Sequence, residues 1–353
     1  MAQELTHTPV CRWCGKGPLG FRFTFDACLD RRRSPLKETF VMEWCASCGA
    51  FQVNPHPGEE LSRVFFSRPD LYLSSLDPEG REVDPVDRAE QRHQEYQGYA
   101  RTALSLMPEN GAVLDLGAGT GLMLSLFPER YRRIAVEPNP EAASKARARG
   151  LEVSELWAED LDKPPERLAL AVFNQSLDHF VRPDIILGRI LNWIPPGGLV
   201  LITGLVNPLS VAARITGPMF RLWHPFHQVY PPRDAVTARL ASFGFETVAV
   251  WRPYFRTPYG SIPALLKGAF TLSKAFVLRS RQGTPSPPWP GNTLSYLARK
   301  ALVFKPLSAL ETREASVKAA RGKAGLIAPL GRVPGPESPS DAARAEALRL
   351  RRA

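Results

Sequence analysis

The stretch Val113–Gly121, Val-Leu-Asp-Leu-Gly-Ala-Gly-Thr-Gly, decides the fold of this 353-residue chain. An apolar strand runs into a turn with three glycines, Gly117, Gly119 and Gly121, and the apolar run Leu122–Phe127 that follows is typical of a helix. Glycine permits φ > 0 and lacks a Cβ, so a ligand can lie against the backbone. The pattern predicts a doubly wound α/β sheet with a binding site where its first strand ends.

A second predicted strand ends in an acidic residue. The apolar run Ile134–Val136 leads into Glu137, twenty positions after the first glycine. A carboxylate at this place can accept both hydroxyls of a ribose. Asp115, at the end of the first strand, would repel a phosphate but suits the cationic end of an amino acid. Together these acids indicate a nucleoside cofactor that has no phosphate.

This Asp-x-Gly-x-Gly-x-Gly pattern with an acid at the next strand end resembles the class I S-adenosylmethionine-dependent methyltransferases. The resemblance covers roughly residues 85–252 and 291–302 and implies a Rossmann-like, seven-stranded sheet with helices on both faces. It also implies that Glu159 or Asp160 binds the exocyclic amine of adenine. The cofactor-binding residues that it implies are Asp115, Gly117, Ala118, Gly119, Gly121, Glu137, Pro138, Glu159, Asp160 and Asn174.

Local signals give the remaining elements of this domain. Asn139 is a helix N-cap with Pro140 at the first helical position, and Gly150 can close that helix. The predicted strands are 151–157, 168–173, 199–203 and 245–250, the predicted helices are 184–193 and 234–243, and a closing antiparallel strand lies within 291–300.

Four cysteines form two knuckles, Cys11-x-x-Cys14 and Cys45-x-x-Cys48. Two such knuckles in a short segment indicate a tetrahedral zinc site with four thiolates, which is closed and therefore structural. A hairpin of 21–25 against 40–44 would span the residues between them. Disulfides are the rival interpretation, but Met1–Pro9 is polar and predicts no signal peptide, and Cys28 leaves the cysteine count odd. The protein is therefore expected to be cytoplasmic.

A zinc module before such a domain resembles two groups of methyltransferases. One acts in bacterial sugar and secondary-metabolite chemistry and includes C-methyltransferases of nucleotide-linked deoxysugars. The other modifies guanine in ribosomal RNA, and its knuckle usually includes a His that is absent here. The first resemblance implies a small-molecule or glycoconjugate acceptor, and the second keeps RNA as an alternative.

The segment Trp223–Tyr230 is expected to lie over the carboxyl ends of the strands, where open α/β sheets place their substrates. The sugar C-methyltransferases have Tyr-x-Glu-His at this distance before a Gly-Phe-Glu. His227 matches the His of that motif, whereas His224 and Phe226 stand at its Tyr and Glu positions. The His therefore carries over, but the C-methylation mechanism does not carry over whole.

Methyl transfer needs the acceptor atom close to the methyl carbon and in line with the leaving sulfur. A hydroxyl acceptor also needs a base, and His has a pKa near working pH. The sequence favours His227 as this base, then His179 and His224, with His93 less suited. The alternative for each is a hydrogen bond to the backbone that positions a loop.

Charge is unevenly distributed along the chain. The net charge is +10, and residues 260–353 hold 16 Lys and Arg against 5 Asp and Glu, so residues 1–259 are nearly neutral. No stretch reaches the ~20 apolar residues of a membrane span. Residues 261–281 predict a broken amphipathic helix pair, for which packing on the sheet edge is favoured over a lid or a peripheral membrane contact.

The predicted organisation has four parts. Residues 1–57 are a zinc-ribbon-like module, 58–84 a linker, 85–305 the cofactor-binding domain with an insertion at 253–290, and 306–353 a basic, disordered tail. Arg31, Arg32 and Arg33 are the one basic cluster flanked by aromatic residues, which supports the RNA alternative. A non-catalytic cofactor- or partner-binding module is the third interpretation.

Overall fold

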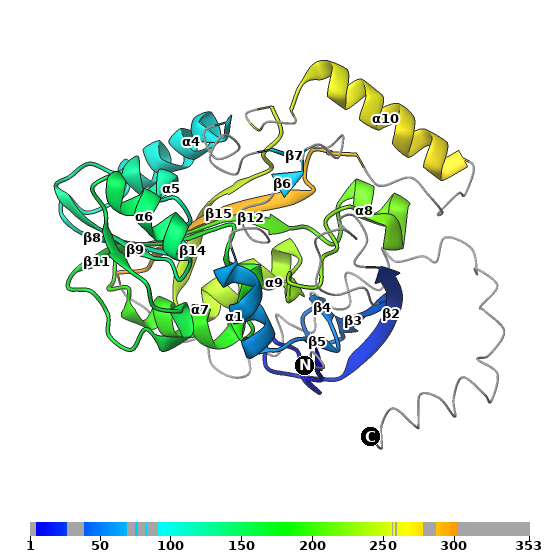
Figure 1. The fold of residues 1–353 in the computed structure, drawn as a ribbon, viewed down its shortest axis with the longest axis horizontal. Helices are drawn as coiled ribbons and strands as arrows, with labels where there is room; N and C mark the ends of the chain where they lie inside the picture. Colours follow the sequence, from blue (N-terminus) through cyan, green and yellow to red (C-terminus); the bar gives the residue numbers. More distant parts are fainter. Residues whose placement is uncertain are drawn as a thin grey trace. The chain divides into compact units, whose positions relative to one another are not determined.

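The structure is a computed structural model, and it describes residues 5–26, 39–68, 75–76, 82–83, 91–255, 257, 260–277 and 287–302 (Figure 1). The chain divides into two compact units, residues 1–306 and 307–353, and the second lies outside the described residues. The predicted disordered tail, Cys28 and the arginine cluster 31–33 also lie outside them.

Within the described residues, seven strands form one mixed sheet in the order β10-β9-β8-β11-β12-β15-β14 (Figure 1). Its strands are β8 (Gly111–Leu116), β9 (Tyr131–Val136), β10 (Glu152–Ser154), β11 (Leu168–Asn174), β12 (Leu199–Val206), β14 (Phe245–Trp251) and β15 (Thr293–Lys300). Only β15 runs antiparallel to its neighbours in this sheet. The predicted class I sheet and its antiparallel closing strand are thereby confirmed.

The helices around this sheet include the predicted ones and two others, one before β8 and one after β12. They are α4 (His93–Leu104), α5 (Leu122–Ser125), α6 (Pro140–Ala148), α7 (Pro183–Trp193), α8 (Val211–Thr216) and α9 (Arg233–Ser242). Asn139 caps α6 as predicted, since its Oδ1 accepts the N–H groups of Glu141 and Ala142 at 3.1 Å. The strand expected over 151–157 is shorter, because its partner β9 ends at Val136, which pairs with Ser154.

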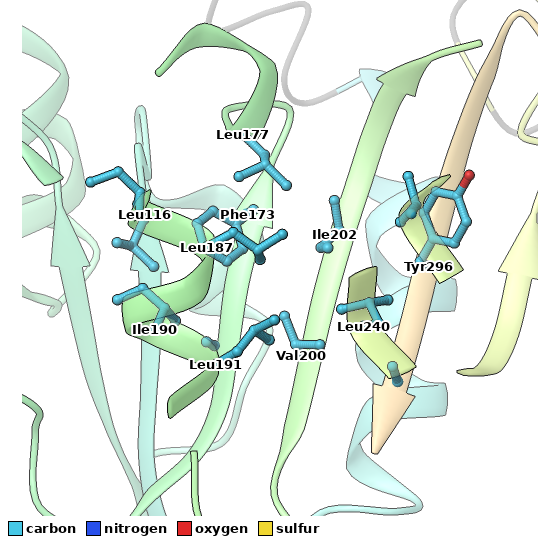
Figure 2. Close-up of a cluster of buried hydrophobic side chains, with 14 of the residues drawn as sticks. Leu116, Phe173, Leu177, Leu187, Ile190, Leu191, Val200, Ile202, Leu240 and Tyr296 are labelled. Carbon is cyan, nitrogen blue, oxygen red and sulfur yellow. The ribbon is translucent and has the colours of Figure 1, made fainter. Parts of the chain in front are cut away.

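A cluster of buried apolar side chains lies between one face of the sheet and the helices that cover it (Figure 2). Leu116, Phe173 and Ile202 project from β8, β11 and β12 towards the apolar side chains of α7, and all are buried. Leu187 and Leu191 of α7 meet them there. A parallel sheet covered on both faces needs such continuous apolar strands. The rigid layer holds the carboxyl ends of the three strands side by side.

The N-terminal residues form a second sheet, in the order β13-β4-β3-β2. Its strands are β2 (Leu19–Asp26), β3 (Thr39–Cys45), β4 (Phe51–Val53) and β13 (Val229–Tyr230). The hairpin of β2 and β3 confirms the predicted pairing. The fourth strand comes from the other part of the chain, since Tyr230 pairs with Phe51. Two small ladders complete the described strands: β1 (Leu5–Thr6) with β5 (His56–Pro57), and β6 (Ser75–Leu76) with β7 (Glu82–Val83).

Two segments differ from the prediction. Residues Glu59–Ser67, expected as linker, form the helix α1, which buries Leu61 and Ser62 and has two acids in its first turn. The expected broken helix pair is one continuous helix, α10 (Ile262–Val277). Pro263 lies in its first turn, where the missing N–H costs nothing, and Gly268 faces Trp289 instead of breaking the helix.

Helix α10 packs against α8, and its Gly268 lies against Trp289. None of the helices in the described ranges is long and apolar enough to cross a membrane.

Candidate active site

The glycine turn joins β8 to α5 at the carboxyl edge of the sheet. Gly117 has φ +74°, and a Cβ there would lie 2.8 Å from the Cβ of Ser176. The Ser176 hydroxyl donates to the carbonyl of Leu116 at 2.5 Å, which ties the end of β11 to this turn. Gly121 has φ +76°, and a Cβ there would clash with Leu151 at 2.4 Å. Both glycines are therefore required by their backbone conformation and by a close neighbour.

Glu137 organises the turn from the end of β9. Its side chain is only 2% exposed; one oxygen accepts the N–H of Gly119 at 2.8 Å and the other accepts the N–H of Asn139 at 2.9 Å. Each carboxylate oxygen keeps a further lone pair for a ligand donor. Burial raises the pKa of Glu137 to about 7, although both backbone N–H groups oppose the shift. Pro138 lies between Glu137 and the cap of α6.

Two more acidic side chains near this edge, the buried Asp115 and the half-buried Glu159, have buried carboxylate oxygens that no described group satisfies. Both oxygens of Asp115 and Oε2 of Glu159 have no hydrogen-bond partner among the described residues. Burial raises the pKa of Asp115 to about 8, and the nearby backbone N–H of Asn174 offsets this only in part. Burial also raises the pKa of Glu159. Buried acceptors without donors are costly, and a ligand with an amine and hydroxyl groups would satisfy them. The residues therefore fit S-adenosylmethionine.

The structure separates the two residues that the sequence offered for adenine. Asp160 is half-exposed and accepts two hydrogen bonds from Arg63 of α1, at 3.0 and 3.1 Å. Glu159 keeps its buried oxygen for a ligand. Asn174, the other predicted residue here, accepts the hydroxyl of Thr203 through Oδ1 at 2.7 Å. Of the two acids, Glu159 is the one with a buried oxygen that no described group satisfies.

The three histidines that the sequence favoured as bases, His179, His224 and His227, lie close together in the structure. The rings of His179 and His227 lie 4.6 Å apart between centroids, and those of His224 and His227 lie 5.5 Å apart. Nδ1 of His179 lies 3.2 Å from the backbone carbonyl of Phe226. Because a carbonyl only accepts, Nδ1 carries the proton, and the lone pair of the neutral ring lies on Nε2. His93 lies on α4 and pairs with Gln97.

The other two histidines are poorer proton acceptors. Burial lowers the pKa of His224 to about 3 and lowers that of His227 well below its usual value, and their histidine neighbours add to both shifts. Asp178 lies 3.7 Å from Nδ1 of His227 and is itself buried, which raises its pKa. The sequence argument did not assign Asp178; its one signal was an acid adjacent to a candidate His.

Aromatic side chains of α1 form the wall beside the histidines. Phe65 stacks on Phe226 with 3.9 Å between ring centroids, and Phe66 meets the ring of His179 edge-on at 5.2 Å. The backbone carbonyl of Phe66 also accepts Nδ2 of Asn139 at 3.0 Å. The helix therefore contacts both the cofactor edge and the histidine cluster. Sequence reasoning missed this wall because it assigned the segment to a linker.

The four predicted zinc ligands come together in the N-terminal module. The sulfur atoms of Cys11, Cys14, Cys45 and Cys48 all lie within 4.8 Å of one another. Two of the pairs are 3.7 Å apart, and none of the four is in a disulfide. A tetrahedron with Zn–S bonds of about 2.3 Å has edges of about 3.8 Å. The four thiols therefore fit one zinc ion with no open coordination position.

Arg12 connects this cysteine cluster to the histidine segment. Its buried guanidinium donates from Nη2 to the carbonyls of Val53 and Gln228, both at 2.7 Å, and from Nη1 to the side-chain oxygen of Gln228. The N–H of Gln228 in turn donates to the carbonyl of Asp178 at 2.7 Å. Burial lowers the pKa of Arg12 to about 9. A zinc ion with four thiolates has a net charge of −2, which would stabilise the adjacent cation.

Comparison with known proteins agrees with this geometry. Residues 88–250 match a family model described as a methyltransferase domain. No curated protein matches the chain. Among solved structures, the chain resembles a SAM-dependent methyltransferase from Thermotoga maritima, a possible histamine N-methyltransferase, at 19% identity and a TM-score of 0.42, covering 61% of this chain and 93% of that one.

It also resembles magnesium protoporphyrin IX methyltransferase from Synechocystis PCC 6803 with bound SAH, at 9% identity and a TM-score of 0.41, covering 62% and 87%. A third likeness is to geranyl diphosphate C-methyltransferase from Streptomyces coelicolor A3(2), at 13% identity and a TM-score of 0.38, covering 58% and 77%. At these scores the likenesses carry no argument about the acceptor.

Proposed function

Since residues 88–250 form a methyltransferase domain, we propose that the protein transfers a methyl group from S-adenosylmethionine to a hydroxyl of a small molecule or glycoconjugate of the sugar or secondary-metabolite type. The histidine cluster carries this proposal, because it sets a proton acceptor with a defined tautomer next to the cofactor edge. When bound, the cofactor supplies an electrophilic methyl group on a sulfonium centre.

We assign the cofactor contacts to three carboxylates near the carboxyl edge of the sheet: Asp115 and Glu137 at the ends of β8 and β9, and Glu159 in the short turn after β10. Glu137 would accept the ribose hydroxyls, Asp115 would face the cationic amino-acid end, and Glu159 would accept the adenine amine. The support for each assignment is the same: a buried carboxylate oxygen with a free lone pair at the carboxyl edge of the sheet. Gly117 and Gly119 form the turn beside these carboxylates, and the N–H of Gly119 holds Glu137 in place.

We place His179 first as the proton acceptor, ahead of His227. The proton of the acceptor hydroxyl would move to Nε2 of His179 as its oxygen takes the methyl group and the methyl–sulfur bond breaks, leaving S-adenosylhomocysteine; Nδ1 keeps its bond to Phe226. The depressed pKa of His227 makes it the weaker base at neutral pH. His227 would instead position Asp178 and the segment around it.

Two substitutions test the base. His179→Asn keeps a donor for the Phe226 carbonyl, because its amide nitrogen takes the place of Nδ1, but it has no basic nitrogen; His179→Ala removes both. General-base assistance is worth ~10²–10⁴-fold in rate, so both variants should lose turnover by about that factor. The affinity of His179→Asn for S-adenosylhomocysteine, measured by calorimetry, should change little. Near-normal turnover of His179→Asn would contradict this role and return the assignment to His227.

The acceptor class is tested separately with labelled cofactor. Product mass spectrometry should detect a methylated compound of low mass after incubation with candidate sugars, lipids and cell extracts. Label found only in RNA would contradict the proposed acceptor while leaving the methyltransferase assignment intact.

We further propose that zinc has a structural role in a reducing compartment, the cytoplasm. The support is the closed set of four free thiols, which a disulfide-forming environment would oxidise.

A further inference from the structure

The helix α10 has two apolar faces. Gly268 and Leu272 form the inner face, which packs against Trp289 and α8. At 3.6 residues per turn, Leu265 lies beside them. These residues account for the contacts that hold the helix on the rest of the unit. On the opposite side of the helix, the described residues provide no neighbour that explains its composition.

The outer face of α10 is apolar and exposed. Ile262, Leu266 and Phe270 follow one another at spacings of four residues, and they are 66%, 66% and 73% exposed. Val277, seven residues after Phe270, lies on the same side of the helix and is 75% exposed. Solvated helices of globular proteins place polar residues on this side. A continuous exposed apolar stripe of this kind is typical of an interaction surface.

The charges beside the stripe are all positive. Lys267 and Lys274, seven residues apart, are exposed and lie on one flank of the apolar stripe. The whole sequence from Thr247 to Leu310 contains nine Lys and Arg and no Asp or Glu. The helix α8, on which α10 packs, also contains no acid. The surface therefore complements an apolar layer that is edged by negative charge, which describes an anionic bilayer.

We propose that α10 is a membrane-surface helix that lies in the headgroup region of an anionic bilayer. Leu266 and Phe270 enter the acyl boundary, and Lys267 and Lys274 contact lipid phosphates. The helix lies parallel to the membrane. This surface is independent of the proposed acceptor, because it rests on exposure and charge alone.

The test is sedimentation of the full chain with two kinds of vesicle. Neutral vesicles contain phosphatidylcholine alone, and anionic vesicles contain about one third phosphatidylglycerol in phosphatidylcholine. The wild-type protein should bind the anionic vesicles. The double variant Leu266→Glu with Phe270→Glu should lose at least about tenfold in affinity, since both the buried apolar area and the local charge change. Lys267→Ser with Lys274→Ser should lose roughly tenfold on anionic vesicles only.

A matched control is Leu156→Glu with Ile185→Glu. These side chains are 46% and 48% exposed, lie outside α10, and give the same change of net charge. This control should bind vesicles like the wild type, and the thermal unfolding midpoints of all variants should agree. Measuring at about 0.5 M salt weakens purely electrostatic attachment of the basic C-terminal residues.

Three outcomes overturn the proposal. In the first, the wild type binds neither kind of vesicle. In the second, the Leu266→Glu, Phe270→Glu variant binds as well as the wild type, so the basic terminus accounts for attachment. In the third, light scattering shows a dimer that this variant converts to a monomer, in which case a second copy covers the stripe.

Discussion

Replacing Glu137 by glutamine would keep the side-chain shape but remove the charge and one acceptor. The two carboxylate oxygens accept the N–H groups of Gly119 and Asn139. Glutamine has one oxygen, so its amide nitrogen must face one of these backbone donors. A buried donor without a partner costs about 1–3 kcal/mol in the free energy of unfolding. The unfolding midpoint should then fall by about 2–4 °C for each kcal/mol.

The loss of cofactor affinity in this variant should be easier to measure than its loss of stability. A hydrogen bond to a charged acceptor is worth about 1.5–3 kcal/mol, which corresponds to a rise in Kd of about 10–150-fold. Titration of S-adenosylhomocysteine in a calorimeter measures it. Glu141→Gln is the control, because Glu141 is exposed and, among the described residues, its side chain forms an ion pair with Lys145 on the surface of α6. If Glu137→Gln binds as tightly as the wild type, the ribose assignment is wrong.

The same carboxylate should make binding depend on pH. Burial raises the pKa of Glu137 from 4.5 to about 7, so the folded protein retains this proton where the unfolded chain has lost it. Glu137 therefore lowers stability as pH rises from about 4.5 to 7. Ribose hydroxyls favour the charged form, so affinity should rise as pH increases through 7, with release of a proton. Glu137→Gln should lose this part of the dependence and keep the part due to Asp115.

Three further predictions concern the surroundings of the site. Elemental analysis should give about one zinc per chain, and Cys45→Ser with Cys48→Ser should remove it; metal that survives both substitutions would contradict the site. Arg12→Met leaves the carbonyls of Val53 and Gln228 without donors and should lower the free energy of unfolding by about 2–4 kcal/mol, measured by urea titration; unchanged stability would show that these bonds are not needed. Phe65→Ala removes the stack on Phe226 and should raise KM for the acceptor while affinity for S-adenosylhomocysteine holds, whereas an unchanged KM would place the acceptor elsewhere.

Local patterns account for what the sequence predicted well. The glycine turn, the acid at Glu137 and the cap at Asn139 depend on a few adjacent residues, so their signals survive without knowledge of the fold. The strands of the sheet were predictable in the same way, because each is a run of apolar residues in the sequence. The four cysteines were found because two short knuckles specify one chemistry.

Contacts between distant segments were not predictable in this way. The approach of Asp178 to His227 depends on how Gln228 is held by Arg12, and no local pattern encodes that. The aromatic wall of α1 was missed because a nine-residue helix gives a weak periodic signal. The expected break within 261–281 is absent from the described part of α10, where Gly268 gives room for the contact with Trp289.

The strand β13 has a consequence for how the chain is synthesised. Tyr230 pairs with Phe51, so the sheet of the zinc module gains its last strand only after most of the catalytic domain has been made. At about 5–20 residues per second, that interval is on the order of ten seconds or more. During it the nascent β4 has an unpaired edge, which is a site for wrong pairing. Early zinc binding would hold the two knuckles together until the ribosome delivers the missing strand.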